Sequence, residues 1–277
     1  MADIKRPWSY EQVHEIVRQA VDEAAFWDDW RPTLIICIAA GGFVPTRILR
    51  SCLKHRYGCN IPIQTIGLQL YDVDGCDPET SPVQRVQWLA YGTGPGQVLL
   101  QGHRILIVDE VDDSRKTLAH AVAELQADIA AERTAFKLAA AENRSSSSSS
   151  SSWQEPQLGV FVLHNKLRPK LAALPEELMR GRYWSGLDIP NCWCKYPWDA
   201  EAIYEHTDKA EAAGLPGRVG GKDNSSGSRA KRQSSGCPPV AAAHQQQQQQ
   251  QHVANGAAAQ HNGNGIANGA HALLNGA

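Results

Sequence analysis

Apolar and polar positions follow two different periods between residues 8 and 206. Apolar residues recur at helical spacing over residues 11–30, and Pro32 ends that pattern. A continuously apolar run follows at 33–38, which is typical of a strand buried on both faces of a sheet. A Gly-Gly turn then leads into an amphipathic stretch that reaches residue 54. This order predicts a helix, a strand, a glycine turn and a second helix.

The same alternation continues further along the chain. A long alanine-rich pattern predicts a helix at 117–143, and the segments 71–97 and 184–198 have weak periodicity and are predicted to be irregular. Further strands are predicted at 61–70, 104–109 and 158–163. Strands that alternate with helices predict an α/β domain with a largely parallel sheet. In such a sheet, ligands bind beyond the carboxyl ends of the strands.

The composition changes toward the end of the chain. Residues 8–206 mix apolar, charged and aromatic residues, whereas residues 207–277 contain no Phe, Tyr or Trp and are rich in Gly, Ala, Ser, Asn, His and Gln. Such a segment cannot bury enough apolar surface to offset the entropy of ordering it. We therefore predict one folded domain over 8–206, with a Ser-rich surface insertion at 144–152, and a disordered tail over 207–277.

The net charge, the apolar runs and the cysteine content exclude several classes of protein. A net charge of −2 excludes a protein that binds nucleic acid through bulk positive charge. No apolar run approaches the roughly 18–20 residues that span a bilayer, and the first residues lack the apolar stretch of a signal peptide. Seven scattered cysteines, an odd number, do not indicate a secreted disulfide framework. We expect a cytoplasmic protein with no nucleic-acid partner and no membrane partner.

The clearest candidate for chemistry lies where the predicted strand at 104–109 ends. Residues 108–118 read VDEVDDSRKTL, with four acidic residues in five positions, followed by Ser114 and Thr117 at the start of a helix. Free N–H groups at a helix N-terminus favour an anion such as phosphate. Carboxylates, in contrast, accept hydroxyl donors or bind a cation. A ligand with both features is a sugar phosphate, although Asp113 or Ser114 could also act only as a helix cap.

These eleven residues resemble the phosphoribosyl-diphosphate (PRPP) motif of type I phosphoribosyltransferases. More narrowly, the chain resembles the fungal xanthine phosphoribosyltransferases and their hypoxanthine-guanine relatives. The resemblance covers nearly all of 8–206 and includes four further blocks, at 38–50, 64–72, 161–166 and 188–200. It implies a parallel sheet flanked by helices, with a small base-binding hood. It also implies PRPP and a purine base as substrates, Mg²⁺ as cofactor, and a homo-oligomer, either a dimer or a tetramer.

The resemblance gives the motif residues their expected roles. Asp109 and Glu110 are expected to hold the ribose hydroxyls and to lie near Mg²⁺. Asp113 corresponds to the carboxylate that exchanges a proton with the purine. The 5′-phosphate is expected to bind to Ser114, Arg115, Lys116 and Thr117. Relatives often have Gly in place of Arg115, which leaves the role of this side chain open.

The glycine turn after residue 38 resembles the pyrophosphate loop of the same family. Ala40, Gly41 and Gly42 would approach the diphosphate through backbone groups, and the family loop often contains a non-proline cis peptide bond. Relatives commonly have Gly, Arg or Lys where Ala40 stands. Arg47 would therefore assist in binding, or it would be an ordinary solvated helix residue. Without the resemblance, a Gly-Gly pair indicates only a tight turn.

The purine is expected to bind beyond the last two predicted elements. By the resemblance, Lys166 donates to the exocyclic oxygen at purine position 6, Trp193 stacks on the ring, and Cys194 contributes backbone atoms. A donor at this place selects against adenine, whose 6-amino group is itself a donor. Asp199 corresponds to an acid near the base and Mg²⁺. Without the resemblance, Lys166 would be interpreted as a surface lysine and Trp193 as a core aromatic.

The segment 71–97 corresponds to the mobile hood of the family, and Tyr71 would lie at its hinge end. The expected function is a purine phosphoribosyltransferase that prefers xanthine, hypoxanthine or guanine. Two alternatives remain open. One is an enzyme of the same fold for another base, against which Lys166 and Trp193 argue. The other is a regulatory protein that binds PRPP or nucleotides without catalysis, against which the complete motif argues.

Overall fold

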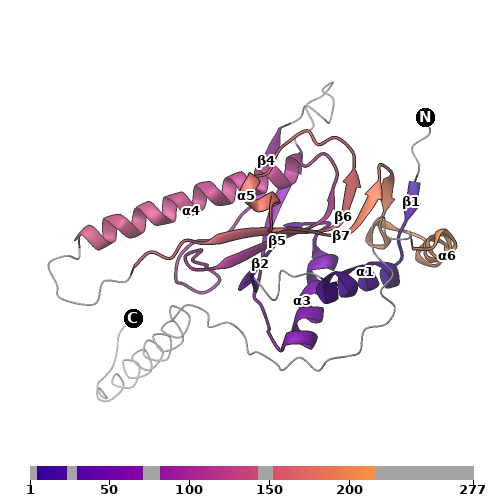
Figure 1. The fold of residues 1–277 in the computed structure, drawn as a ribbon, viewed down its shortest axis with the longest axis horizontal. Helices are drawn as coiled ribbons and strands as arrows, with labels where there is room; N and C mark the ends of the chain where they lie inside the picture. The colour runs from indigo at the N-terminus through magenta and orange to yellow at the C-terminus, as the bar shows by residue number, and fades with distance from the viewer. Residues whose placement is uncertain (1–4, 24–29, 71–81, 143–151, 216–277) are drawn as a thin grey trace, which may run out of the picture. The chain divides into compact units, whose positions relative to one another are not determined.

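The computed structural model describes residues 5–23, 30–70, 82–142 and 152–215. The predicted hinge residue Tyr71, nearly all of the Ser-rich insertion and the tail beyond residue 215 lie outside these ranges. The described part is built around a six-stranded sheet with helices on both faces (Figure 1). α1 (Tyr10–Glu23) and α3 (Phe43–Tyr57) cover one face, and α4 (Lys116–Glu142) and α5 (Glu176–Met179) cover the other.

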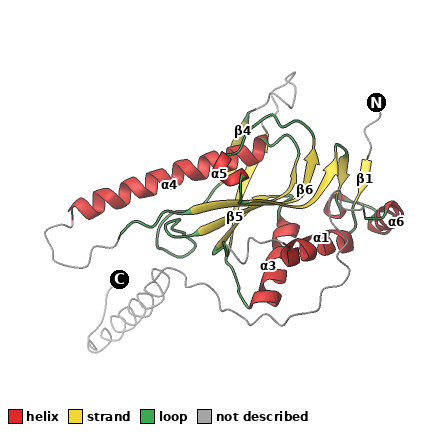
Figure 2. Ribbon diagram, viewed as in Figure 1, coloured by secondary structure: helices red, strands yellow, loops and turns green. Residues whose placement is uncertain are grey.

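The sheet confirms the predicted α/β class. Its strand order is β4-β3-β2-β5-β6-β7, and all neighbours pair in parallel except β4, which is antiparallel to β3. Figure 2 shows the strands in yellow between the helices in red. The strands are β2 (Leu34–Ala39), β3 (Ile63–Leu70), β4 (Val83–Gln87), β5 (Arg104–Asp112), β6 (Gln157–Leu167) and β7 (Tyr183–Pro190). β2 and β5, which form the middle of the sheet, end at the same edge.

The apolar runs of the central strands supply both halves of the core. Alternate side chains of a strand point to opposite faces of the sheet. Accordingly, Ile35 and Leu106 are buried against α1 and α3, whereas Ile36 and Ile107 are buried against α4. This two-sided burial explains why the strands appear as continuous apolar runs in the sequence.

Three elements lie where the sequence predicts irregular structure or the end of the domain. β4 is an edge strand with four of its five side chains exposed, so it has no apolar alternation to detect. β7 contains Gly186, where a Cβ would lie 2.7 Å from Cγ2 of Ile16, so this glycine allows α1 to pack closely rather than ending the strand. Helix α6 (Ile203–Ala213) crosses the predicted domain boundary at residue 206, and its Ala210 is fully buried.

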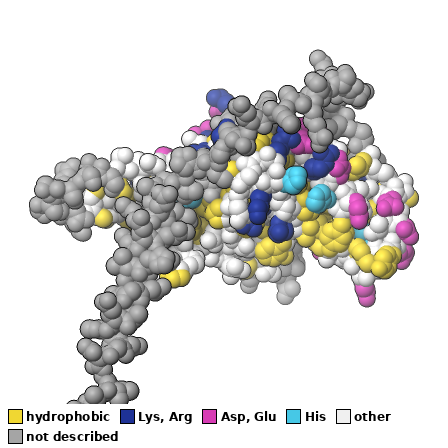
Figure 3. Space-filling model, turned by 90° about the horizontal axis from the view of Figure 1, so that it is seen from below, with side chains coloured by type: hydrophobic (Ala, Val, Ile, Leu, Met, Phe, Trp, Pro, Cys, Tyr) yellow, Lys and Arg dark blue, Asp and Glu magenta, His cyan; other side chains and the backbone are white. Residues whose placement is uncertain are grey.

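A small two-stranded sheet lies beside the main one. β1 (Lys5–Pro7) pairs in parallel with β8 (Trp193–Lys195), which is followed by the short 3-10 helix η2 (Pro197–Asp199). The face of the molecule in Figure 3 carries basic, acidic, histidine and apolar side chains rather than charge of one sign. In the ranges given above, no helix combines the length and the apolar character needed to cross a membrane.

Candidate functional site

A cavity of about 310 Å³ lies at the carboxyl ends of β2 and β5. Its wall is formed by residues 38–41 at the end of β2, by Leu68 of β3, and by residues 109–118. Parallel strands end at a common edge, and this brings two segments that are distant in the sequence into one wall. The predicted PRPP-binding residues that line this cavity are Ala40, Gly41, Asp109, Glu110, Asp113, Ser114, Arg115, Lys116 and Thr117.

Two carboxylates form one part of the wall. Asp109 is buried, and its Oδ1 accepts a hydrogen bond from the backbone N–H of Glu110 at 2.9 Å. Burial, helped by the nearby charge of Glu110, raises the pKa of Asp109 well above its usual range. The carboxyl group of Glu110 lies close to Gly41, where a Cβ would be only 2.1 Å from its carboxyl carbon. A side chain at position 41 would displace the carboxyl group of Glu110, which in this structure faces the turn after β2.

The opposite part of the wall is the start of α4. Oγ of Ser114 accepts a hydrogen bond from the backbone N–H of Lys116 at 3.4 Å, which caps the helix. The lining continues through Leu118, so the first turn of α4 borders the cavity. This turn carries free N–H groups and the positive end of the helix dipole. The arrangement suits an anionic group such as a phosphate.

Only some of the residues predicted to bind the diphosphate, which lie in or after the turn that follows β2, line the cavity. The peptide bond between Ala39 and Ala40 is cis, as the resemblance predicts. Gly42 is buried, and a Cβ there would lie 2.5 Å from the carbonyl oxygen of Ile38, so its role is close packing of α3 on β2. Arg47 is exposed and donates to Oγ of Ser51, one turn further along α3. Gly42 and Arg47 do not line the cavity, and Arg47 has the surroundings of a solvated helix residue.

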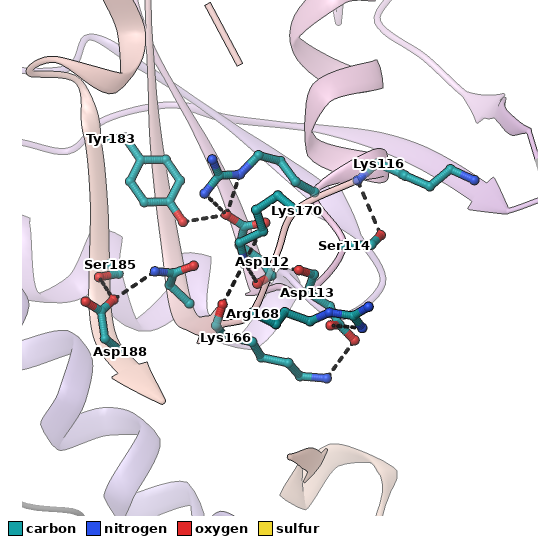
Figure 4. A network of polar contacts seen from close by, with 12 residues as sticks. Asp112, Asp113, Ser114, Lys116, Lys166, Arg168, Lys170, Tyr183, Ser185 and Asp188 are labelled. Carbon is teal, nitrogen blue, oxygen red and sulfur yellow. Dashed lines mark hydrogen bonds and ion pairs between the residues drawn. The ribbon is translucent and has the colours of Figure 1, made fainter. Parts of the chain in front are cut away.

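Asp113 connects the motif to the end of β6. Nζ of Lys166 donates to its Oδ2 at 2.6 Å, and Nη1 of Arg168 donates to its Oδ1 at 3.2 Å (Figure 4). The side chain of Lys166 is almost completely buried, whereas that of Asp113 is partly exposed. The residue expected to exchange a proton with a base and the residue expected to bind its 6-oxo group are thus in direct contact.

Asp112, the acidic residue before Asp113, is fully buried. Its Oδ2 accepts hydrogen bonds from Nε of Arg115 at 2.9 Å, from Nη2 of Arg115 at 2.7 Å, and from the hydroxyl of Tyr183 at 2.6 Å (Figure 4). The role of the Arg115 side chain, which the sequence left open, is in this structure a contact with Asp112 rather than with the cavity. Arg115 borders the cavity, but its guanidinium group is bound to a carboxylate that carries the opposite charge.

The residues predicted to contact the purine ring lie around a second cavity of about 800 Å³, next to α6. Trp193, Cys194 and Asp199 line it together with Tyr196. Trp193 is 57% exposed, so core packing does not account for its position. Burial raises the pKa of the Cys194 thiol to about 11, so this thiol is protonated at neutral pH and is not activated as a nucleophile.

Comparison with known proteins places this geometry in a family. No family model matches the chain. The chain is 43% identical over 210 residues to a hypoxanthine-guanine phosphoribosyltransferase of Schizosaccharomyces pombe, which covers 74% of this chain and 94% of that protein. It is 42% identical over 221 residues to xanthine phosphoribosyltransferase 1 of Saccharomyces cerevisiae, covering 77% and 99% respectively. The chain belongs to the type I phosphoribosyltransferase family.

A solved structure agrees with this family fold. It is a protein from Neisseria gonorrhoeae with bound ppGpp, 30% identical to this phosphoribosyltransferase, with a TM-score of 0.56. The match covers 77% of this chain and 99% of that one. The sequence resemblance drawn from the motif is thereby confirmed for the family and the fold.

The acid pair Asp109 and Glu110 is not by itself a complete metal site. Within the described ranges, no group of three His, Cys, Asp or Glu residues is arranged to hold a metal ion. Asp109 and Glu110 line the first cavity and Asp199 lines the second, so the three predicted magnesium ligands are not gathered. Mg²⁺ usually binds one or two carboxylates together with substrate phosphates. The Asp109–Glu110 pair fits that donor set.

Sequence reasoning missed the basic and aromatic partners of the motif. Arg168 binds Asp113, Lys170 lies 3.4 Å from Oδ1 of Asp112, and Tyr183 binds the same carboxylate. A usable signal for two of them was present, because basic residues alternate at 166, 168 and 170 directly beyond a strand. Tyr183 gives no comparable signal, since it belongs to a strand that the sequence does not predict.

Proposed function

We propose that this phosphoribosyltransferase transfers the phosphoribosyl group of PRPP to a 6-oxopurine, giving a nucleoside monophosphate and pyrophosphate. Relatives named for hypoxanthine, guanine and xanthine are 42–43% identical to the chain, and these three bases are the candidate acceptors. The observation that carries the proposal is one cavity bordered both by an acid pair and by a helix N-terminus. That combination suits a sugar that carries phosphate groups.

PRPP has three polar parts, and the cavity offers a partner for each. The ribose hydroxyls would donate to Asp109 and Glu110. The 5′-phosphate would accept hydrogen bonds from the N–H groups of residues 114–117 and from the hydroxyls of Ser114 and Thr117. The diphosphate would lie against the backbone of residues 39–41, where the glycine leaves the backbone uncovered.

Magnesium would be held by Asp109 and Glu110 together with oxygen atoms of PRPP. A bound ion would offset the negative charge of the diphosphate leaving group. It would also stabilise the charged form of Asp109, which burial disfavours. Turnover should therefore stop when a chelator removes Mg²⁺ and return when the ion is restored.

The base would be recognised along one edge. In a purine, the oxygen at position 6 and the nearby imidazole nitrogen lie on the same edge, so a neighbouring donor and acceptor can bind both. Lys166 and Asp113 form such a pair, 2.6 Å apart. Lys166 would donate to the 6-oxo group, and Asp113 would take the proton that leaves the imidazole ring when the new C–N bond forms. Trp193 would stack on the ring, with backbone atoms of Cys194 at its edge.

The setting of the enzyme is also proposed on the family likeness. We expect a cytoplasmic enzyme that acts as a homo-oligomer, either a dimer or a tetramer. Size-exclusion chromatography with light scattering measures the oligomeric state directly, and a monomer at micromolar concentration would contradict this expectation.

Pyrophosphate release from PRPP and Mg²⁺ tests the proposed reaction. It should be measured with xanthine, hypoxanthine, guanine and adenine separately, with nucleotide formation followed in parallel. We expect release with at least one 6-oxopurine and far less with adenine. Preferred use of adenine would contradict the base assignment. Nucleotide binding without release for any base would favour the regulatory alternative.

A further inference from the structure

The carboxylate of Asp112 is unavailable to any ligand in the cavity. Its side chain has no exposed surface, and the side chain of its partner Arg115 is 12% exposed. Oδ2 accepts three hydrogen bonds, two from Arg115 and one from Tyr183, while Nζ of Lys170 lies 3.4 Å from Oδ1 (Figure 4). A charged carboxylate is strongly unfavourable in such surroundings unless it is paired and hydrogen-bonded. Oδ2 of Asp112 meets this condition, whereas the buried Oδ1 has the ion-pair contact with Lys170 but no hydrogen bond.

Arg115 has an unusual backbone conformation in the middle of the phosphate-binding loop. Its φ is +70°, in the left-handed region that favours glycine. Its guanidinium group lies over the ring of Tyr183, 5.1 Å from the ring centre, and returns to Asp112 three residues earlier. The two hydrogen bonds between Arg115 and Asp112 thereby close a ring with the backbone of residues 112–115. This ring holds the loop in a conformation that an arginine alone would disfavour.

Lys170 attaches the same loop to the end of β6. Its Nζ donates to the backbone carbonyls of Asp112 at 2.6 Å, Asp113 at 3.0 Å and Lys166 at 2.9 Å. The next residue adds a backbone bond, from the N–H of Leu171 to the carbonyl of Ser114 at 3.0 Å. The loop that would bind the 5′-phosphate and the segment that would bind the base therefore share one set of hydrogen bonds.

We propose that Asp112 and Arg115 are a positioning pair, which sets the backbone geometry of residues 113–117 for the 5′-phosphate without touching it. Tyr183 and Lys170 support the pair from β7 and from the segment after β6. This inference rests on the proposed function for the identity of the ligand, and on the contacts above for the role of the pair. It assigns a function to Asp112 and to the side chain of Arg115, whose role the sequence left open.

Charge alone does not explain this arrangement, because well-packed apolar residues can replace a buried ion pair with little loss of stability. What the pair adds is a fixed distance between residues 112 and 115 through a fork of two guanidinium donors that both bind Oδ2 of Asp112. Lysine at position 115 would keep the charge but lose the fork. Glycine would accept the φ of +70° without strain but would leave Asp112 without its main partner.

Three variants test the pair, namely Arg115→Gly, Arg115→Lys and Tyr183→Phe. The matched control is Arg180→Ala, because Arg180 is also in an ion pair, with Glu176, but is exposed. Circular dichroism first establishes that each variant is folded. We expect Arg115→Gly to raise the KM for PRPP about tenfold or more, since it removes charged hydrogen bonds, while kcat falls much less. Arg115→Lys and Tyr183→Phe should show smaller increases, and the control none.

Amide hydrogen exchange gives a readout that is independent of catalysis. In Arg115→Gly, exchange at residues 113–117 should become faster than in the wild-type protein, with β2 and β5 unchanged. A wild-type KM for PRPP together with wild-type exchange in the loop would overturn the proposal, whatever happens to the melting temperature. If the wild-type chain releases no pyrophosphate, the proposed function fails. The exchange comparison then still decides whether the pair holds the loop.

Discussion

Asp112 and Asp113 are adjacent in the chain but lie in opposite surroundings. Both residues belong to the cavity wall, but the side chain of Asp112 is 0% exposed and has fixed partners, whereas that of Asp113 is 38% exposed. Asp112 is the last residue of β5, and Asp113 is the first residue of the loop. The change from strand to loop therefore separates two identical side chains into a buried side and a cavity side of one motif.

The difference shows that residue type alone does not determine a role in this site. On the buried side, Asp112, Arg115 and Tyr183 bind one another, so substitutions there should change loop geometry or stability. On the cavity side, the partly exposed Asp113 borders the cavity and binds Nζ of the nearly buried Lys166, so substitutions there should change chemistry or base choice. The next three predictions run from the larger to the smaller expected effect, and the most direct test of this division follows them.

Removal of the Lys166 side chain should alter which purine base the enzyme prefers. Lys166→Ala deletes a charged donor to the 6-oxo group, and such hydrogen bonds contribute about 1.5–3 kcal/mol. We expect the ratio of kcat/KM for the best 6-oxopurine to kcat/KM for adenine to fall about 10- to 100-fold. Steady-state kinetics with both bases measures the ratio. Arg180→Ala is the control, and an unchanged ratio in Lys166→Ala would remove Lys166 from base recognition.

His164, a buried residue on the same strand as Lys166, should affect the stability of the fold at acidic pH rather than the choice of base. Burial, with a smaller effect of Arg6, lowers the pKa of His164 to about 3. The unfolded chain binds a proton at this histidine below about pH 6.5, and the folded chain does not, so stability falls as the pH falls from about 6.5 toward 3. Between about pH 7 and pH 5.5, His164 should account for a loss of roughly 1 kcal/mol.

Urea unfolding at these two pH values measures that loss. His164→Gln should be less stable than the wild type at neutral pH, but its stability should depend less on pH. The control His14→Gln, at an exposed position of α1, should retain the wild-type dependence. An equal pH dependence in His164→Gln and wild type would show that His164 is not the group responsible.

The smallest effect is expected for Arg47, which belongs neither to the buried side nor to the cavity side of the motif. Arg47 is exposed and bonded within α3, so Arg47→Ala should leave the KM for PRPP within about twofold of the wild type. A tenfold increase would instead show that Arg47 reaches the diphosphate, as one of the two sequence-based interpretations holds.

The sequence predicts the central part of the fold well. β2 and β5 are buried on both faces, so each appears in the sequence as a continuous apolar run that can be recognised without the structure. β4 and β7 were not predicted, because β4 is an exposed edge strand and β7 contains Gly186, which resembles a strand-breaking residue. In each of these strands, packing against an element that is distant in the sequence decides the structure. A local sequence pattern does not show which element that is.

The candidate site could be predicted only in its local part. Residues 109–117 are contiguous, so their motif and position after a strand were visible in the sequence. Arg115, a partner of Asp112, lies within the motif, but other partners come from elsewhere, since Lys166 is 53 residues from Asp113 and Tyr183 is 71 residues from Asp112. The left-handed φ of Arg115 was also hidden, because it depends on the bond between its own side chain and Asp112.

The most direct test compares Asp112→Asn with Asp113→Asn in the same experiment. PRPP affinity with Mg²⁺ and turnover at saturating substrates should be measured for both. Asp113→Asn should lose about 10²- to 10⁴-fold in turnover, as expected for a general acid–base group, while PRPP affinity stays within about threefold. Asp112→Asn should lose about tenfold in PRPP affinity and less in turnover. Wild-type turnover in Asp113→Asn, or the same pattern of losses in both variants, would contradict the division of roles between these two neighbours.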